Sequence, residues 1–147
     1  MGEAEALFEA KRLASRTNAG RWNELVYCIL AGTQVPIETA RRAHTDLVGL
    51  GLVKLNRIAD APETYRRRIG SALQKCGYRY YRQKAATIVA AAKFLCRRCD
   101  GDVATFLKRG EVETRVEELV KGVAGIGLKT ANHWPRWTLE NRPSIDT

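Results

Sequence analysis

The sequence predicts an all-α protein, and two observations support this fold class. Apolar residues recur with helical spacing along nearly the whole chain of 147 residues. Alternating apolar runs joined by an Asn-Gly or Asp-Gly pair, the pattern of a β-hairpin, do not occur in it. A chain of this length with 45% hydrophobic residues can bury one core. We find no repeat and no Pro/Ser-rich linker, so nothing in the sequence divides that core.

Nine helical segments follow from the apolar spacing and from residues typical of helix ends. They are expected over residues 4–15, 22–31, 36–48, 55–59, 62–75, 80–97, 102–108, 114–121 and 129–137. The first is amphipathic and ends in the polar stretch 17–20. The second is apolar throughout, so we expect it at the centre of the core. Pro36 suits the first turn of the third helix, which ends at the glycine-containing break 49–51.

The starts of the later helices carry their own signals. Asp60 and Pro62 are the residue types of a capped helix start, so the fifth helix begins there. Asp102 is expected to cap the seventh helix. Thr114 and Glu117 have the spacing of a capping box, which opens the eighth.

The composition points to a polyanionic partner. The formal net charge is +9 and the isoelectric point is near 9.7. Between residues 64 and 109 the only acidic residues are Asp100 and Asp102. The basic residues of this block are Arg66, Arg67, Arg68, Lys75, Arg79, Arg82, Lys84, Lys93, Arg97, Arg98, Lys108 and Arg109. Two interpretations stay open for the block, a solvated surface and a face that contacts phosphates.

Four cysteines do not make a disulfide framework in a core of this size. Cys28 and Cys76 have apolar neighbours and are expected to be small core residues. Cys96 and Cys99 form a C-x-x-C motif, which can indicate metal or redox chemistry. The motif has no second pair and falls at the end of a helix, so we favour a structural role.

The most informative stretch of the chain is residues 123–131, which read Val-Ala-Gly-Ile-Gly-Leu-Lys-Thr-Ala. Gly125 and Gly127 allow a tight turn and a close approach of the backbone to another molecule. The helix that follows starts with unpaired N–H groups and the positive end of its dipole, which suits a phosphate. A turn of this kind between two helices therefore suits contact with a phosphate, whereas a Gly-x-Gly pair alone is usually only a turn.

This arrangement resembles the helix-hairpin-helix DNA-binding element. Lys129, two residues after the second glycine, narrows the resemblance to the base-excision DNA glycosylases of the endonuclease III and 8-oxoguanine glycosylase superfamily. In that superfamily this Lys attacks the sugar, and an Asp some 17 residues later completes the site. Asp146 stands at that distance. The resemblance implies the superfamily's fold, with Lys129 and Asp146 as catalytic residues.

Two further segments resemble one branch of the superfamily. Residues 22–30 and 77–85 are similar to the corresponding parts of the archaeal-type (type 2) 8-oxoguanine DNA glycosylases. The loop 32–34 lies where relatives place small polar residues that enter the DNA stack. The resemblance implies 8-oxoguanine as the lesion. The implied DNA contacts are Thr33, Gln34, Arg79, Lys84, Gly125, Gly127 and Thr130.

The resemblance also implies the chemistry of a bifunctional glycosylase and AP lyase. The target nucleotide must be flipped out of the helix. Lys129, with a neutral amine in a partly desolvated site near cationic groups, attacks C1′, while Asp146 stabilises the oxocarbenium-like charge. The resulting Schiff base permits β-elimination. No redox cofactor or catalytic metal is required, and the hairpin is expected to hold Na⁺ or K⁺ through the backbone carbonyls of Lys121, Val123 and Ile126.

The chain departs from the superfamily at its end. It stops one residue after Asp146, so the helices that follow in relatives, and the four cysteines that hold a [4Fe–4S] cluster in many of them, are missing. We expect a fold truncated after that Asp and no iron–sulfur cluster. One helical domain should cover 20–137, with the helix-hairpin-helix at 114–137, and 1–19 and 138–147 should be remnants of a second domain. We expect DNA binding but poor cleavage until a second polypeptide or a longer form completes the fold.

The remaining expectations concern location and alternatives. The start has no secretory signal and no apolar stretch reaches the length of a membrane span, so we expect an intracellular protein of the cytoplasm or nucleoid. Its partner is damaged double-stranded DNA, without a membrane. One alternative is a non-catalytic helix-hairpin-helix module that binds DNA. Another is a monofunctional relative, or an endonuclease III-like glycosylase for oxidised pyrimidines.

Overall fold

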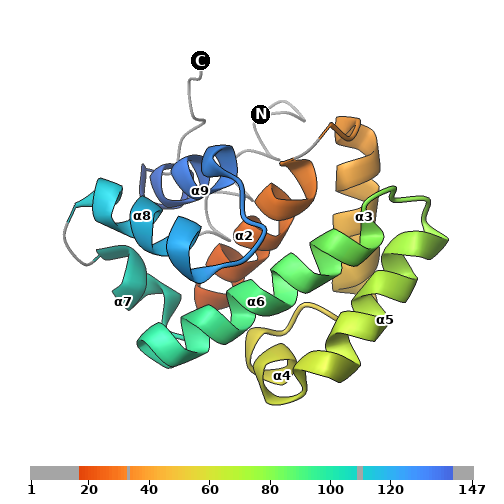
Figure 1. Ribbon diagram of the computed structural model, residues 1–147, viewed down its shortest axis with the longest axis horizontal. Coiled ribbons are helices and arrows are strands. Elements are labelled where there is room, and N and C mark those ends of the chain that lie inside the picture. The colour runs from red at the N-terminus through yellow and green to blue at the C-terminus, as the bar shows by residue number, and fades with distance from the viewer. Residues whose placement is uncertain (1–16, 33, 109–110, 141–147) are drawn as a thin grey trace, which may run out of the picture.

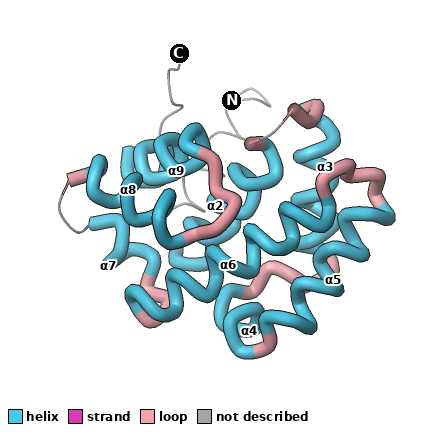
Figure 2. Tube along the Cα trace, in the orientation of Figure 1, coloured by secondary structure: helices cyan, strands magenta, loops and turns pink. Residues whose placement is uncertain are grey.

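The computed structural model of the chain describes residues 17–32, 34–108 and 111–140, the last four by their backbone alone. Only helices and loops occur in this part of the chain (Figure 2). The helices are α2 (Asn18–Ala31), α3 (Ile37–Gly49), α4 (Leu55–Asp60), α5 (Pro62–Lys75), α6 (Tyr81–Cys99), α7 (Val103–Lys108), α8 (Val112–Gly122) and α9 (Leu128–Glu140). The predicted all-α fold is confirmed. The helix expected over 4–15 lies outside the described residues.

Helix α6 is the axis around which the others are arranged (Figure 1). It packs against α4 and α5 along one flank and against α2 and α7 along others. Its buried face includes Ala85, Ile88, Ala92 and Leu95, which are the residues of an apolar stripe at helical spacing. Helix α9 packs on α2 and α8, so the last helix of the described chain lies against the first.

Helix α2 is central, as its apolar sequence predicts, and aromatic side chains hold it there. Trp22 and Trp134 are the two largest fully buried side chains. The indole N–H of Trp22 donates to the carbonyl of Val53 at 2.7 Å, and that of Trp134 donates to the carbonyl of Arg21 at 2.9 Å. A buried indole N–H usually finds an acceptor. Each hydrogen bond therefore helps to fix the orientation of the helix that carries the Trp, in addition to the packing of its ring.

Two of the predicted helix caps are wrong, although α5 has the predicted bounds. Thr114 and Glu117 form no capping box, because α8 begins two residues earlier, at Val112, with no side-chain hydrogen bond at its cap. Val112 is partly buried and packs against the core, which draws the start of the helix forward. Asp60 does not cap α5 either. It is the last residue of α4, and α5 begins at Pro62 behind an uncapped Ala61.

Other helix starts are set by side chains. Asp102 caps α7 as predicted, since its carboxylate accepts the Thr105 N–H at 3.2 Å and the Thr105 hydroxyl at 2.7 Å. These hydrogen bonds lower the pKa of Asp102. Helix α2 begins earlier than predicted because the Thr17 hydroxyl accepts the Gly20 N–H at 2.8 Å. The polar stretch 17–20 therefore opens α2.

The cysteines have the structural roles that the sequence indicates. Cys28 is buried and Cys76 partly buried. The Cys96 thiol lies 3.8 Å from the side-chain oxygen of Asn56, and the Cys99 thiol donates to the Leu95 carbonyl at 3.0 Å. Burial raises the pKa of both thiols, which opposes metal and redox chemistry. Within the described ranges, no group of three His, Cys, Asp or Glu residues is arranged to hold a metal.

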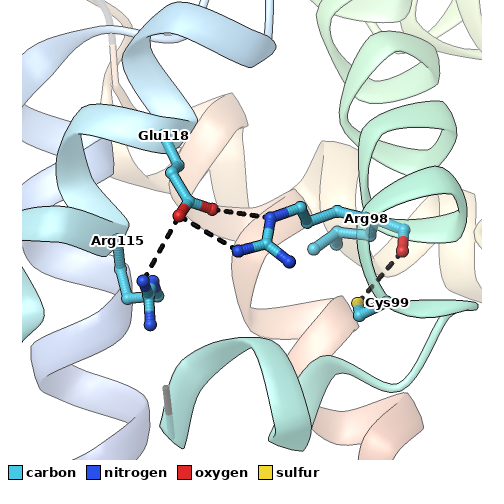
Figure 3. A network of polar contacts seen from close by, with 5 residues as sticks. Arg98, Cys99, Arg115 and Glu118 are labelled. Carbon is cyan, nitrogen blue, oxygen red and sulfur yellow. Dashed lines mark hydrogen bonds and ion pairs between the residues drawn. The ribbon is translucent and has the colours of Figure 1, made fainter. Parts of the chain in front are cut away.

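A network of charges joins α6 to α8 (Figure 3). The Arg98 guanidinium donates to both carboxylate oxygens of Glu118, at 3.0 and 3.2 Å. Arg115, which is 4% exposed, donates to the same carboxylate at 3.3 Å and lies over the Phe106 ring. Hydrogen bonding by Arg98 lowers the pKa of Glu118 below its ordinary value near 4.5. Helix α8 leads directly into the turn at 123–127. The network therefore helps to hold the helix before this turn against α6.

The pairing predicts a pH-dependent contribution to stability. Since the pKa of Glu118 is lower in the folded protein, its stabilisation is complete above the unfolded value and is lost as the pH falls through the folded one. We expect Glu118→Gln to lower the free energy of unfolding by about 1 kcal/mol at neutral pH. Urea unfolding at a series of pH values should show this difference vanish in acid. Glu117→Gln, which changes an exposed neighbour, is the control, and an equal pH dependence for both variants would contradict the assignment.

Candidate nucleic-acid interface

The turn between α8 and α9 is a compact hairpin that places Val123 and Ile126 in the core while Ala124 and Leu128 are exposed. Val123 and Ile126 are buried, and the Ile126 N–H donates to the Val123 carbonyl at 3.2 Å. The Ala131 N–H donates to the Gly127 carbonyl at 3.0 Å, so Gly127 occupies the N-cap position of α9. The hairpin lies against α6 (Figure 2). The first N–H groups of α9 have no intrahelical acceptor, as at any helix start.

The two glycines of the hairpin have different roles. Gly125 has a φ of +87°, and a Cβ there would collide with the hydroxyl of Thr87 on α6. Gly125 is thus required by the fold, both for its backbone conformation and for its contact. Gly127 has no neighbour within 4 Å of the position of a Cβ. Its backbone borders open space, where another molecule can approach it.

Lys129 lies in the first turn of α9 and its side chain is exposed. The described residues alone do not enclose Lys129, so the partly desolvated site stays a prediction. The side chain points away from the core because the buried positions of this turn are taken by Thr130 and Ala131. Asp146, the second predicted catalytic residue, lies outside the described residues.

The side chain of Thr130 is part of the packing between α9 and α2. It is 5% exposed, and its hydroxyl donates to the carbonyl of Cys28 at 3.2 Å. A Cβ at Gly32 would collide with this hydroxyl. The side chain thereby ties α9 to the end of α2, and the DNA contact predicted at Thr130 stays a prediction. Only the backbone N–H of Thr130 remains for such a contact.

The structure brings three of the other predicted contacts to one place. An open hollow of about 600 Å³ lies beside the hairpin, between the loop after α2 and the first turns of α6. Gln34, Lys84 and Gly125 all line it, although they are far apart in the sequence. Arg79 is exposed just before α6, with its guanidinium 5.5 Å from the ring centroid of Tyr80, which also lines the hollow. Thr33 lies outside the described residues.

Lys84 is the unusual residue of the hollow. Its side chain is 8% exposed, and burial lowers the pKa of its amine. No ion pair of Lys84 occurs among the described residues, and no Asp or Glu lines the hollow. The amine is partly desolvated and has no counter-charge beside it, so this position is suited to an anion from outside.

Two residues that line the hollow beside the hairpin were not predicted from the sequence. Thr87 supports the hairpin by its contact with Gly125, and Tyr80 forms part of the hollow's wall. Thr87 lies three residues after Lys84 on the same helix, a spacing that places side chains side by side. That spacing could have indicated Thr87, but the partner across the contact could not be read from sequence.

The basic block from residue 66 to 109 does not form one surface. Arg66 pairs with Glu63 at 2.8 Å and Arg98 pairs with Glu118 at 3.0 Å, so these two serve the fold. Lys84 faces the hollow beside the hairpin. Phosphate contact by the other residues of the block stays a prediction.

The hairpin carbonyls proposed for a monovalent cation fit such an ion in part. Lys121 lies in the last turn of α8, where carbonyls lack an intrahelical donor. The Val123 carbonyl accepts one hydrogen bond, from Ile126, and keeps a second lone pair.

No helix in the described part of the chain is both long and apolar enough to cross a membrane.

Comparison with known proteins gives one match. The family model described as 8-oxoguanine DNA glycosylase, of the helix-hairpin-helix type, matches residues 4–139. The match includes α6, the hairpin and Lys129, and it ends before Asp146. Searches of curated proteins and of solved structures found no significant match. The match spans most of the chain, and it agrees with the all-α fold and with the hairpin, so the chain belongs to the 8-oxoguanine DNA glycosylase family of helix-hairpin-helix proteins.

Proposed function

We propose that this protein excises an oxidised base, 8-oxoguanine, from duplex DNA and then cleaves the strand at the abasic site. The observation that carries the proposal is the hairpin with an open backbone at Gly127, followed directly by the exposed Lys129 at the start of α9. A primary amine and the backbone that would bind a phosphate are thus within one helical turn of each other. The family match supports a DNA glycosylase role.

Binding comes first in the proposed mechanism. A phosphate approaches Gly127, where a side chain would intrude, and accepts hydrogen bonds from the free N–H groups of α9. Contacts of this kind position the duplex without reading its sequence. The damaged nucleotide is then flipped out of the stack, because its C1′ cannot be reached inside the duplex.

The chemical step uses Lys129 as the nucleophile. Its neutral amine forms a bond to C1′ as the bond between C1′ and the base nitrogen breaks, and the base leaves with a proton. The sugar ring opens to a Schiff base, loss of the C2′ proton follows, and the C3′–O bond breaks by β-elimination. Because Lys129 is exposed in the free protein, bound DNA has to supply the desolvation that favours a neutral amine. Asp146 would stabilise the developing charge on the sugar.

A monovalent cation is proposed at the hairpin. The backbone carbonyls of Lys121, Val123 and Ile126 would hold it, and its charge would add to the attraction for a phosphate. The reaction itself requires no redox cofactor in this proposal.

One observation favours a second candidate function. The Lys129 side chain is exposed, and it does not line the hollow beside the hairpin. A helix-hairpin-helix module that binds DNA without catalysis would have these properties. Covalent trapping distinguishes the two functions, since only an enzyme with a reactive amine forms an adduct.

Lys129→Gln should abolish the adduct that borohydride traps between the protein and a duplex with one 8-oxoguanine. Affinity for the same duplex should stay within about threefold, because binding is carried mainly by the backbone. Lys54→Gln removes the same charge at an exposed position before α4, to which the proposal gives no role, and should leave trapping intact. An undiminished adduct in Lys129→Gln would exclude this residue as the nucleophile, and no adduct in the unaltered protein would favour the non-catalytic module.

The two hairpin glycines should separate folding from binding. Gly125→Ala should lower the free energy of unfolding by about 1–3 kcal/mol, because of its positive φ and the collision with Thr87. Gly127→Asn should keep or raise stability, since Asn is a favoured N-cap residue.

The same Asn side chain would occupy the N–H groups of α9 and obstruct the backbone. Affinity for damaged and undamaged duplex should therefore fall by a similar factor, about tenfold. Denaturant unfolding and fluorescence anisotropy measure the two effects. Unchanged affinity in a folded Gly127→Asn protein would contradict the placement of DNA at the hairpin.

A further inference from the structure

We propose that the hollow between the hairpin and the start of α6 binds a second phosphodiester group of the DNA backbone, with Lys84 as its cation. This inference rests on the proposed DNA-binding function and names a ligand group and a binding residue for it. The first phosphate is assigned to the open side of the hairpin at Gly127. The second lies on the other side of the same turn, at Gly125.

The hollow is built from segments that only the fold brings together. Gln34 comes from the loop after α2, Tyr80 and Lys84 from the start of α6, and Gly125 from the hairpin. The hairpin can approach α6 this closely because Gly125 has no side chain to meet Thr87. One wall of the hollow is therefore the backbone of the DNA-binding turn itself.

Lys84 is placed to receive an anion there. Its side chain is more than nine-tenths buried, and it lines the hollow without an ion pair among the residues that the structure describes. The methylene stem accounts for much of the burial, as is usual for a lysine on an apolar surface. Desolvation lowers the pKa of the amine, so the free protein bears a cost at this position that an anion would relieve.

The chemistry of the hollow favours phosphate over another charged group. No carboxylate lines it, so a cationic ligand would find no counter-charge. The Thr87 hydroxyl donates to the Gln83 carbonyl at 3.0 Å and is not free to donate to a ligand. The side chains that can donate are the Lys84 ammonium, the amides of Gln34 and Gln83, and the Tyr80 hydroxyl. A group that only accepts hydrogen bonds and carries negative charge, such as a phosphodiester, fits these donors.

The test compares two lysines of α6 that lie on opposite faces. Lys84 and Lys93 are nine residues apart, which is half a turn out of phase on an α-helix. Lys93 is exposed, and its charge acts on Glu63 of α5. Lys84→Met and Lys93→Met therefore remove the same charge from the same helix, one inside the proposed site and one outside it.

Affinity for an undamaged duplex is measured by fluorescence anisotropy over a series of salt concentrations. We expect Lys84→Met to weaken binding about tenfold near 0.1 M salt and to reduce the slope of log affinity against log salt by about one. Lys93→Met should leave the slope unchanged. A purely structural role for Lys84 would not change the slope, because the slope counts phosphates neutralised.

Thermal unfolding shows whether the variant protein is intact. Replacing the partly desolvated, unpaired ammonium of Lys84 by an apolar side chain of similar length should leave the melting temperature equal or higher. Lys84→Gln provides a second variant should Lys84→Met fold poorly. Equal slopes for the unaltered protein and a folded Lys84 variant would overturn the inference while leaving the proposed function in place. No binding of duplex by the unaltered protein would overturn the proposed function, and this inference with it.

Discussion

The contact between Gly125 and Thr87 determines how the functional part of this protein is arranged. At that point the hairpin backbone meets the side of α6 with no Cβ between them. The positive φ of Gly125 turns the chain so that Val123 and Ile126 enter the core while Gly127 faces open space. The start of α9, the direction of Lys129 and the wall of the hollow at Lys84 all follow from this one close approach.

Two further constraints hold α9 at the angle that the hairpin gives it. Near its start, the Thr130 hydroxyl donates to the end of α2 at Cys28. One turn further on, Trp134 is fully buried and donates to the carbonyl of Arg21 at the start of α2. The helix is thus attached at both ends of α2. Because its N-terminus is held by buried groups, the N–H groups there can be presented to a ligand without the helix moving.

The charges of the protein divide into those that support the fold and those left for a ligand. Arg98 and Arg115 share Glu118 and join α6 to α8, so their charge is compensated within the protein (Figure 3). Lys84 and Lys129 have no such partner among the described residues. A net charge of +9 supplies long-range attraction to a polyanion. In the proposed function, Lys84 beside the hairpin is where that attraction becomes contact.

The sequence by itself determined the helices and the hairpin, because both depend on residues close together in the chain. Apolar spacing predicted every helix in the described part, and a Gly-Ile-Gly turn followed by Lys-Thr-Ala predicted the DNA-binding element. Tertiary packing decided the rest. Val112 packs on the core and moves the start of α8 away from Thr114, which local capping rules had favoured. The Thr130 side chain turned inward because Cys28, 102 positions earlier, offers it an acceptor. The environment of Lys84 depends on three segments that meet only in the folded chain, so its burial could not be deduced from its neighbours in sequence.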